Sequence, residues 1–368
     1  MKYIKGFDVL RAIAVLLVIH HHWGSLSSSS PVLNFISQKI IPTGTFAVDL
    51  FFVLSGFLLT GILISSKVKF AQNSKWLIIR NFIARRSLRI FPIYYLLIIA
   101  LYLINYQDVR QHIIYFATYS SNFMIFHNGN WVDDLSHLWT LAVEEQFYLI
   151  WPFCIVFIPD RFLVHLMLLF IIAGTAITVF TEYKYGFFGT ILPYNCFNAF
   201  AIGGLYAYSL TGRKNSAVIQ KTLFYLLPFA IICYVMIEAG VPHIPFRLVY
   251  AIITVNLIMY VQKGVYGKFG EAILNNRMLI NLGKISYGVY LYHQLTQFFY
   301  YGLLHFSERK LHAGKHLLSI LYQPYVAEVI QFILLIIISY LSYIFIEMKI
   351  LRLKKYFQHD DSAVINLV

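Results

Sequence analysis

The sequence predicts an all-α polytopic membrane protein, and three observations support this. Of the 368 residues, 59% are hydrophobic and only 12% are charged, whereas soluble proteins average roughly 25% charged residues. Apolar runs of about 20 residues, the length that crosses a hydrocarbon core, recur along the whole chain. The lysines and arginines gather in alternate connections between these runs. We therefore expect a bundle of transmembrane helices.

About ten spans are expected in one integral membrane domain, residues 1–346, followed by a short cytoplasmic tail, residues 347–368. Segment 106–135 contains an apolar run of about 14 residues, which is marginal for a span and also fits an interfacial or re-entrant helix. We therefore do not count it as a span. The predicted spans are 7–23, 46–65, 90–105, 136–158, 162–180, 193–210, 222–239, 245–262, 285–305 and 325–346.

The net charge of +13 is explained by membrane topology. With ten spans, about three quarters of the 29 lysines and arginines fall on one side. Such asymmetry marks the cytoplasmic side, so both termini are predicted to be cytoplasmic. We accordingly expect the lipid bilayer as a partner and no nucleic acid.

The three cysteines indicate neither a disulfide framework nor a metal site. Cys154, Cys196 and Cys233 all fall in predicted spans, are odd in number and have no CxxC spacing. This pattern is typical of cysteines that act as small buried apolar residues. We expect no bound metal.

The first predicted span carries polar residues along one face. Eleven helical steps of 100° separate Arg11 from His22, which places both on one face, roughly 16 Å apart along the axis. Asp8 lies within about 60° of that face, His20 points to the opposite side, and His21 lies about 80° away. Charged and titratable groups inside a membrane usually mark a functional path. The alternative is an interfacial histidine cluster with a structural Asp8–Arg11 pair.

Polar groups recur in the second span and before the third. Asp49 is near the outer end of its span, where it can face the mouth of a cavity, and Ser55 and Gly56 are small enough for close helix packing. Arg86 and Arg89 are three residues apart, so their guanidinium groups can point the same way and bind phosphate oxygens. They can hold either an anionic cofactor or lipid phosphate.

The fourth span begins with SHLWTLAVEEQF and contains two carboxylates. Glu144 and Glu145 lie about two turns into the helix and point roughly 100° apart, so only one can fully face a polar site. The first span leaves toward the side from which this span enters. Glu144 and His22 are therefore expected at similar depth, within reach of each other.

The ninth span contains a polar stripe. Tyr287, Tyr290 and His293 recur at three-residue spacing and can line the inner part of a cavity. Aromatic residues are also common at membrane interfaces, which is the alternative interpretation.

Together these segments resemble the acyltransferase 3 family of membrane acyltransferases. The resemblance spans residues 7 to about 293, in family order. It is carried by FDVLRAIAVLLVIHHHWG, VDLFFVLSGFLLTG, RRSLRIFPIYYL, SHLWTLAVEEQFYLIWP and the weaker LGKISYGVYLYHQ.

The resemblance implies an enzyme of the bacterial cytoplasmic (inner) membrane that transfers an acyl group, most often acetyl, from cytoplasmic acyl-coenzyme A. The acceptor is a hydroxyl of a cell-surface carbohydrate or its lipid-linked precursor, such as O-antigen, capsule or exopolysaccharide. Some members carry an extracytoplasmic hydrolase-like domain. Such a domain is not found in this sequence, so a separate envelope protein is a possible partner.

The resemblance also assigns roles to residues. His22 matches the family's essential histidine, Arg11 its partner, and Arg86 and Arg89 the Arg-x-x-Arg motif that contacts the donor. The triplet of histidines departs from the usual single histidine, so the assignment of His22 depends on spacing.

We expect His22 to act as general base, with Glu144 or Asp49 orienting it. An acyl-histidine intermediate is the alternative mechanism. The predicted substrate-binding residues are Asp8, Arg11, Asp49, Ser55, Trp139, Tyr287, Tyr290 and His293. The alternative function is a transporter or flippase for a lipid-linked sugar or small anion.

Overall fold

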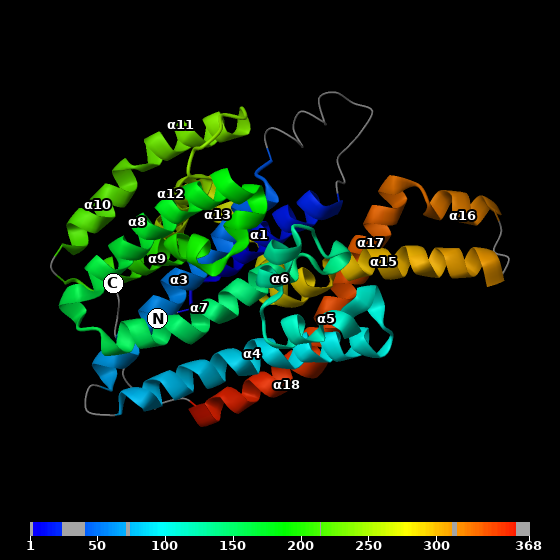
Figure 1. Ribbon diagram of the computed structural model, residues 1–368, viewed down its shortest axis with the longest axis horizontal. Helices are drawn as coiled ribbons and strands as arrows, with labels where there is room; N and C mark the ends of the chain where they lie inside the picture. The colour runs from blue at the N-terminus through cyan, green and yellow to red at the C-terminus, as the bar shows by residue number, and fades with distance from the viewer. Residues whose placement is uncertain (1–2, 24–40, 71–73, 214, 311–314, 358–368) are drawn as a thin grey trace.

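The computed structural model describes residues 3–23, 41–70, 74–213, 215–310 and 315–357, which form helices and connecting turns without any β-strand. Figure 1 shows their arrangement. The α-helices are α1 (Lys5–Trp23), α3 (Gly44–Lys69), α4 (Lys75–Leu103), α5 (Val109–Ala117), α6 (Ser121–Asn128), α7 (Leu138–Phe157), α8 (Asp160–Tyr185), α9 (Pro193–Ser209), α10 (Ser216–Tyr225), α11 (Leu227–Glu238), α12 (Phe246–Lys263), α13 (Lys268–Leu274), α14 (Arg277–Lys284), α15 (Ser286–Lys310), α16 (Lys315–Leu321), α17 (Pro324–Ser342) and α18 (Met348–Leu351).

The described part of the chain contains six helical stretches long and apolar enough to cross a membrane, or seven if the bent pair α12–α13 is one span. This confirms an all-helical integral membrane protein. The predicted spans at α1, α9 and α15 are also helical, but α9 has only 17 residues and the other two carry several polar residues. The total of ten spans and the cytoplasmic position of both termini remain predictions.

Segment 106–135 does not form a continuous helix. It contains α5 and α6, of nine and eight residues, each less than half of a membrane-spanning length. Tyr94 and Tyr95 on α4 hold α5 in place by donating hydrogen bonds to the carbonyl oxygens of Phe116 and Ala117, at 2.9 and 2.8 Å. The structure therefore supports leaving this segment out of the span count.

The last helix continues into the predicted tail. A π-helical turn, Tyr343–Glu347, joins α17 to α18, and a 3₁₀ turn extends the helical path from Arg352 to Phe357. The rest of the predicted tail, 358–368, lies outside the described residues.

Helix α3 is central and packs against α1, α7, α9 and α12. Its contact with α9 is close because glycines lie at the crossing: a Cβ on Gly56 would lie 2.0 Å from the carbonyl oxygen of Phe200, and one on Gly203 would lie 2.0 Å from that of Val53. The close helix approach predicted for Gly56 is confirmed.

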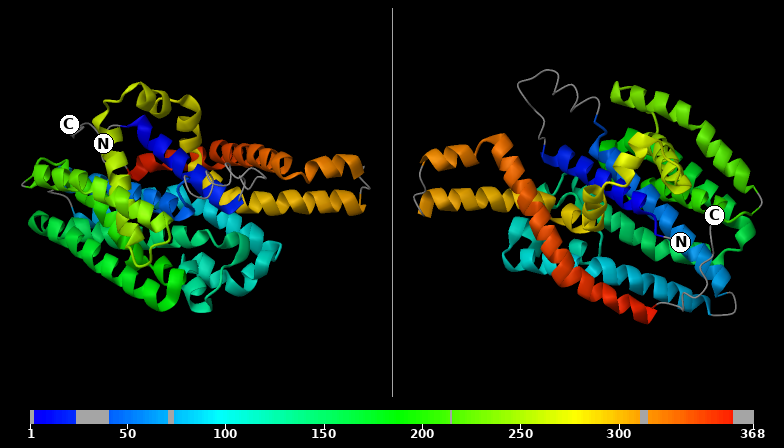
Figure 2. Two further views of the ribbon diagram at one scale, coloured as in Figure 1. Left: turned by 90° about the horizontal axis from the view of Figure 1, so that it is seen from above. Right: turned by 180° about the vertical axis from the view of Figure 1, so that it is seen from behind.

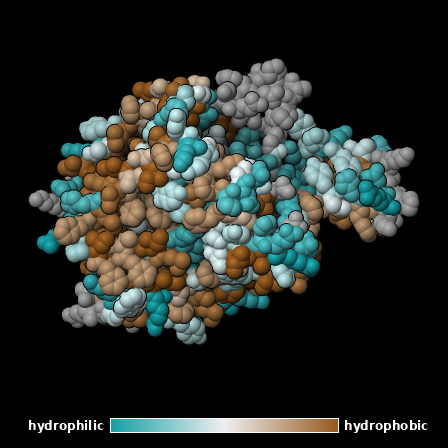
Figure 3. All heavy atoms as spheres, viewed as in Figure 1, coloured by the Kyte–Doolittle hydropathy of each residue, from teal (hydrophilic) through white to brown (hydrophobic). Residues whose placement is uncertain are grey.

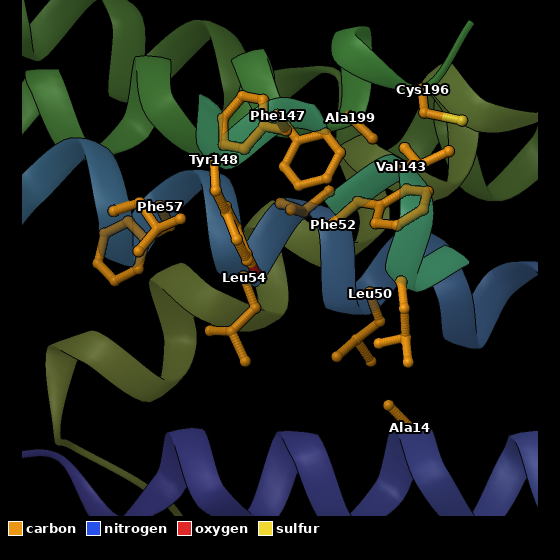
Figure 4. Packing of buried hydrophobic residues seen from close by; sticks show 14 of the residues in the cluster. Ala14, Leu50, Phe52, Leu54, Phe57, Val143, Phe147, Tyr148, Cys196 and Ala199 are labelled. Carbon is orange, nitrogen blue, oxygen red and sulfur yellow. The ribbon is translucent and has the colours of Figure 1, made fainter. Parts of the chain in front are cut away.

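Aromatic side chains fill the adjoining layer between α3, α7 and α9. Phe52 and Phe147 both stack on Phe200, with ring centroids 4.7 and 3.9 Å apart. Figure 4 shows this packing and Ala14 of α1 facing Leu50 of α3. The aromatic layer and the glycine crossing fix α3 relative to α7, on which part of the site lies.

The surface divides into an apolar bundle and a hydrophilic projection. Large apolar side chains such as Ile172, Phe180 and Phe229 are exposed on α8 and α11, and apolar colour covers much of the bundle in Figure 3. The C-terminal half of α15 and α16 extend beyond the bundle (Figure 2), where the surface is mostly hydrophilic. The bundle surface suits contact with lipid.

An ion-pair network ties several helix ends together. Lys67 at the end of α3 lies 2.9 Å from Asp160 at the start of α8, and Arg213 lies 2.7 Å from the other oxygen of Asp160. Lys67 also donates to the carbonyl oxygens of Ile155 and Ile158. Lys67 and Arg213 are thus engaged in holding the fold together.

Candidate active site

Three cavities follow one another along α1. The first, the basic-end cavity of about 360 Å³, is lined by Tyr3, Ile4, Phe7, Asp8, Arg11, Phe57, Leu58, Ile62, Arg86, Arg89, Leu210 and Gln262. The second, the central cavity of about 100 Å³, is lined by residues that include Arg11, Ser55, Arg86, Arg89, Thr140, Glu144, Tyr148, Tyr287 and Tyr290. The third, the histidine cavity of about 310 Å³, is lined by residues that include His21, His22, Trp131, His137, Trp139, Thr140, Phe187, Tyr290 and Gln294.

Shared walls join these cavities into a row. Arg11, Arg86 and Arg89 line both the basic-end and central cavities. Thr140 and Tyr290 line both the central and histidine cavities. The row therefore extends from the first turns of α1 to its last turn.

The arginines at the basic end are held by short contacts. Asp8 binds Arg11 at 2.7 Å and accepts a hydrogen bond from the Tyr3 hydroxyl at 2.5 Å. The Arg86 guanidinium lies 5.9 Å from the ring centroid of Tyr148, within cation–π range. The predicted Asp8–Arg11 pair is present, and the structure brings Arg11, Arg86 and Arg89 around one space.

Glu144 lies on the central cavity rather than beside His22. Its carboxylate accepts a hydrogen bond from Tyr148 at 2.7 Å, and the Tyr148 hydroxyl lies 3.4 Å from that of Ser55. Figure 4 shows Tyr148 reaching from α7 to α3. The expected contact of Glu144 with His22 is not formed, because Glu144 lines the central cavity together with Arg11, Arg86 and Arg89, whereas His22 lines the histidine cavity.

His22 is held by a residue from another helix. Its Nδ1 lies 2.7 Å from Nε2 of Gln294, and its ring centroid lies 5.1 Å from that of His293. His21, which we expected on a different face, also lines the histidine cavity. Two of the three consecutive histidines therefore reach this space.

Two buried histidines, His137 and His293, lie behind His22, with ring centroids 4.8 Å apart. Nδ1 of His293 lies 2.7 Å from the carbonyl oxygen of Tyr290, while its buried Nε2 has no hydrogen-bond partner among the described residues. A buried polar atom without a partner is uncommon and calls for a ligand or water. No group of three or more His, Cys, Asp or Glu in the described ranges is arranged to hold a metal ion.

The predicted tyrosine stripe lies on the cavity row. Tyr287 donates to the carbonyl oxygen of Ile90 at 2.9 Å and lines the central cavity. Tyr290 donates to the carbonyl oxygen of His137 at 2.9 Å and lies between two cavities. His293 continues the face, as predicted, but is fully buried.

Asp49 is not at a cavity mouth. It forms an ion pair with Arg247 at 2.7 Å, and both side chains are almost fully buried, at 0% and 1% exposure. The Arg247 guanidinium also lies over the ring of Trp139, 5.8 Å from its centroid. The expectation that Asp49 faces a cavity and orients His22 is wrong, whereas Trp139 does line the histidine cavity.

Four residues of this region escaped sequence reasoning: His137, Tyr148, Arg247 and Gln294. His137 and Tyr148 lie in the SHLWTLAVEEQFYLIWP segment and Gln294 ends LGKISYGVYLYHQ, but spacing within these motifs does not predict the contacts of the three side chains. Arg247 lies near the start of the predicted span 245–262 and belongs to no motif. Its pairing with Asp49 is a tertiary contact 198 positions apart.

The described helices thus form a membrane-protein bundle in which a row of cavities leads from an arginine cluster to a histidine cluster. A family model described as an acyltransferase domain matches residues 4–348. The chain belongs to this family, the acyltransferase 3 family, as its motifs predicted. No solved structure matches it.

The similar curated proteins are longer than this chain. It is 29% identical to the peptidoglycan O-acetyltransferase OatA of Listeria monocytogenes, over 79% of this chain and 49% of that protein. It is 38% identical to the putative peptidoglycan O-acetyltransferase YrhL of Bacillus subtilis, over 42% of this chain and 24% of that protein. It is 30% identical to the O-acetyltransferase OatA of Staphylococcus aureus, over 44% and 26%. The chain thus aligns with half or less of each relative.

Proposed function

We propose that this protein transfers an acetyl group from cytoplasmic acetyl-coenzyme A to a hydroxyl of a cell-wall carbohydrate or its lipid-linked precursor. The row of cavities that leads from Arg11, Arg86 and Arg89 to His22 is the observation that carries this proposal. The family match favours acyl transfer over the transporter alternative.

The basic-end cavity has the chemistry for the donor. Three guanidinium groups surround it, and guanidinium is well suited to phosphate oxygens. Apolar residues such as Phe57 and Leu58 line the rest of the wall and suit a thin, mostly apolar arm. Arg11 and His22 are roughly 16 Å apart along the continuous helix α1, which an extended pantetheine arm can cover.

The histidine cavity has the chemistry for the transfer. The nitrogen of His22 that does not contact Gln294 takes the proton of the acceptor hydroxyl. The hydroxyl oxygen then forms a bond to the acyl carbon, the carbon–sulfur bond breaks, and the thiolate leaves. A neutral imidazole suits this step because its usual pKa is close to 6.5. His22 is therefore the proposed general base.

Glu144 has a different role in this scheme. Its carboxylate shares the central cavity with the arginines and Tyr148, so it orients the donor arm and balances the positive charge there. It thus remains part of the candidate active site without serving as the partner of His22.

The acceptor enters the histidine cavity from the end lined by aromatic rings. Trp131 and Phe187 are partly exposed and lie 5.9 Å apart between ring centroids. Such rings offer flat apolar surfaces beside the polar groups of Ser136 and Thr45, a combination that suits the alternating faces of a pyranose ring. The peptidoglycan acetyltransferases named above make a cell-wall glycan the first acceptor to test.

The test uses purified protein in nanodiscs with acetyl-coenzyme A labelled in the acetyl group and a lipid-linked cell-wall precursor as acceptor. Wild type and His20→Ala are expected to consume the thioester and label the acceptor, while His22→Ala does neither. Arg86→Ala with Arg89→Ala is expected to raise KM for the donor.

Two results would change the proposal. Turnover that survives His22→Ala in folded protein would refute the role of His22. Label that accumulates on the protein and is absent from His22→Ala would replace direct transfer with an acyl-histidine intermediate.

A further inference from the structure

Gln294 bridges two histidines through its side-chain amide. Its Nε2 lies 2.7 Å from Nδ1 of His22, and its Oε1 lies 3.2 Å from Nδ1 of His137. The three residues come from α15, the last turn of α1 and the residue before α7. The amide of Gln294 therefore contacts Nδ1 of His22 and Nδ1 of His137.

The amide orientation decides which nitrogen of His22 is free. An amide N–H that donates to Nδ1 requires a lone pair there, so the proton of neutral His22 is on Nε2. His22 then has no lone pair to offer to an acceptor hydroxyl. If the amide turns over, its oxygen accepts from Nδ1–H and the lone pair of Nε2 becomes available as the base.

His137 is bonded so that it can accommodate either orientation. Its two ring nitrogens face three oxygens: Asp134 O at 3.1 Å and Gln294 Oε1 at 3.2 Å from Nδ1, and Leu291 O at 3.3 Å from Nε2. A neutral imidazole has one N–H and cannot donate at both nitrogens, whereas an imidazolium can. With neutral His137, the turned amide donates to its Nδ1 while Nε2–H donates to Leu291.

We propose that Gln294 is the positioning residue that sets the tautomer of His22. When His22 takes the proton of the acceptor hydroxyl, the amide oxygen of Gln294 faces Nδ1 of His22. This inference rests on the proposed function of His22 as the base. Holding a catalytic histidine in the wrong tautomer can cost up to about 10⁴-fold in kcat. Gln294 touches neither reacting atom in this scheme and acts only through His22.

The first test is the pH profile of kcat/KM for three variants. Gln294→Leu removes the bridge and is expected to lower kcat/KM tenfold or more. Gln294→Glu supplies only acceptor oxygens, so it keeps Nδ1–H and stabilises the imidazolium, which moves the acid limb of the profile to higher pH. Thr296→Val, on the same helix, removes a hydroxyl that donates to the carbonyl oxygen of Tyr292 and is expected to leave the profile unchanged.

Several titratable groups near His22 can contribute to the acid limb of the kcat/KM pH profile. The groups that face His22 and Gln294 are His21 on α1, His137 before α7, and Tyr290 and His293 on α15. The His22 limb is therefore identified by its response to Gln294→Glu in protein that also carries His21→Asn.

The second test reports the tautomer without relying on activity. ¹⁵N-histidine spectra in nanodiscs with the carbohydrate acceptor bound, with His22 assigned by its loss in His22→Ala, are expected to show Nδ1 protonated in wild type and Nε2 protonated in Gln294→Leu. The same His22 tautomer in both proteins would overturn the inference. Loss of activity in both Gln294 variants with an unshifted limb would also overturn it, since a purely structural role would produce that pattern. Full turnover by His22→Ala would refute the proposed function instead, and the spectra would still test the Gln294 bridge.

Discussion

The hydroxyl groups of Tyr290 on α15 and Thr140 on α7 lie 2.5 Å apart where the central cavity meets the histidine cavity. Both hydroxyls also lie within hydrogen-bond distance of the carbonyl oxygen of His137, at 2.9 and 3.1 Å, and their two protons can serve two of these three contacts at a time. Side chains from two helices thus define the junction between the arginine-lined and histidine-lined spaces. In the proposed function, an acyl group that moves from the central cavity to the histidine cavity passes beside this pair.

Enlarging Thr140 is expected to separate donor binding from transfer. In Thr140→Leu, the larger side chain narrows the junction, so we expect kcat to fall at least tenfold while the dissociation constant for acetyl-coenzyme A changes less than threefold. Isothermal titration and steady-state kinetics on the same nanodisc sample measure both. Thr140→Ser keeps the hydroxyl and is the control. Equal losses of binding and turnover in Thr140→Leu would show that the junction is not a passage.

Gly283 is expected to be intolerant of any side chain. A Cβ there would lie 1.9 Å from the carbonyl oxygen of Asp8, whereas one on Gly288 would have its nearest neighbour at 3.4 Å. Gly283→Ala should therefore separate α14 from α1 and cost about 1–3 kcal/mol of stability. Gly288→Ala should change little. Thermal unfolding followed by size-exclusion chromatography compares the two, and equal melting temperatures would contradict the close packing at Asp8.

The sequence predicted much of the α1 side of the site because helical periodicity is local. The 100° step placed Asp8, Arg11 and His22 on one face, and the structure has all three on the cavity row. The same arithmetic placed His21 about 80° away from that face, yet His21 also lines the histidine cavity. At the end of a helix, one cavity can contact side chains from more than one face. Depth estimates from span boundaries were coarser still, and they put Glu144 beside His22.

The failure at Asp49 has a different physical origin. A carboxylate near the end of a span can face water or pair with a cation from another helix, and spacing along one helix does not distinguish these cases. Its partner, Arg247, is on α12, 198 positions further along the chain. The Gln294 bridge between two histidines was equally inaccessible, since it depends on how α15 packs against α1.

Breaking the Asp49–Arg247 pair is expected to destabilise the protein rather than weaken substrate binding. Asp49→Ala leaves a fully buried guanidinium without its counter-ion, at a cost of about 3–5 kcal/mol. Replacing both partners, as Asp49→Leu with Arg247→Met, should recover much of that loss. Unfolding midpoints of the three variants test this. An unchanged midpoint in Asp49→Ala together with a higher KM for the acceptor would restore the substrate-binding role.

Trp131 is expected to contribute to acceptor binding. If its ring packs on the acceptor sugar, Trp131→Ala should raise KM for the acceptor about tenfold, equivalent to about 1.4 kcal/mol, and leave KM for acetyl-coenzyme A unchanged. Trp76→Ala is a suitable control, because Trp76 is also exposed but packs on Phe153 and Phe157 of α7. A rise in the donor KM, or no change in either, would place the acceptor elsewhere in the histidine cavity.

The orientation of the whole row in the membrane can be tested directly. The charge distribution predicts that Gly267, between α12 and α13, is cytoplasmic and that Asn130, after α6, is on the opposite side. Both positions are exposed, and a Cβ at Gly267 would meet no atom within 4 Å. In a background with Cys154, Cys196 and Cys233 replaced by alanine, a membrane-impermeant maleimide should label Asn130→Cys in intact cells and Gly267→Cys only after permeabilisation. Labelling of both cysteines in intact cells would rule out an odd number of membrane crossings between residues 130 and 267. Labelling of Gly267→Cys in intact cells, with Asn130→Cys labelled only after permeabilisation, would place the arginine cluster outside, away from cytoplasmic acetyl-coenzyme A. Because the predicted donor is confined to the cytoplasm, this experiment also decides whether the basic-end cavity can be its entrance.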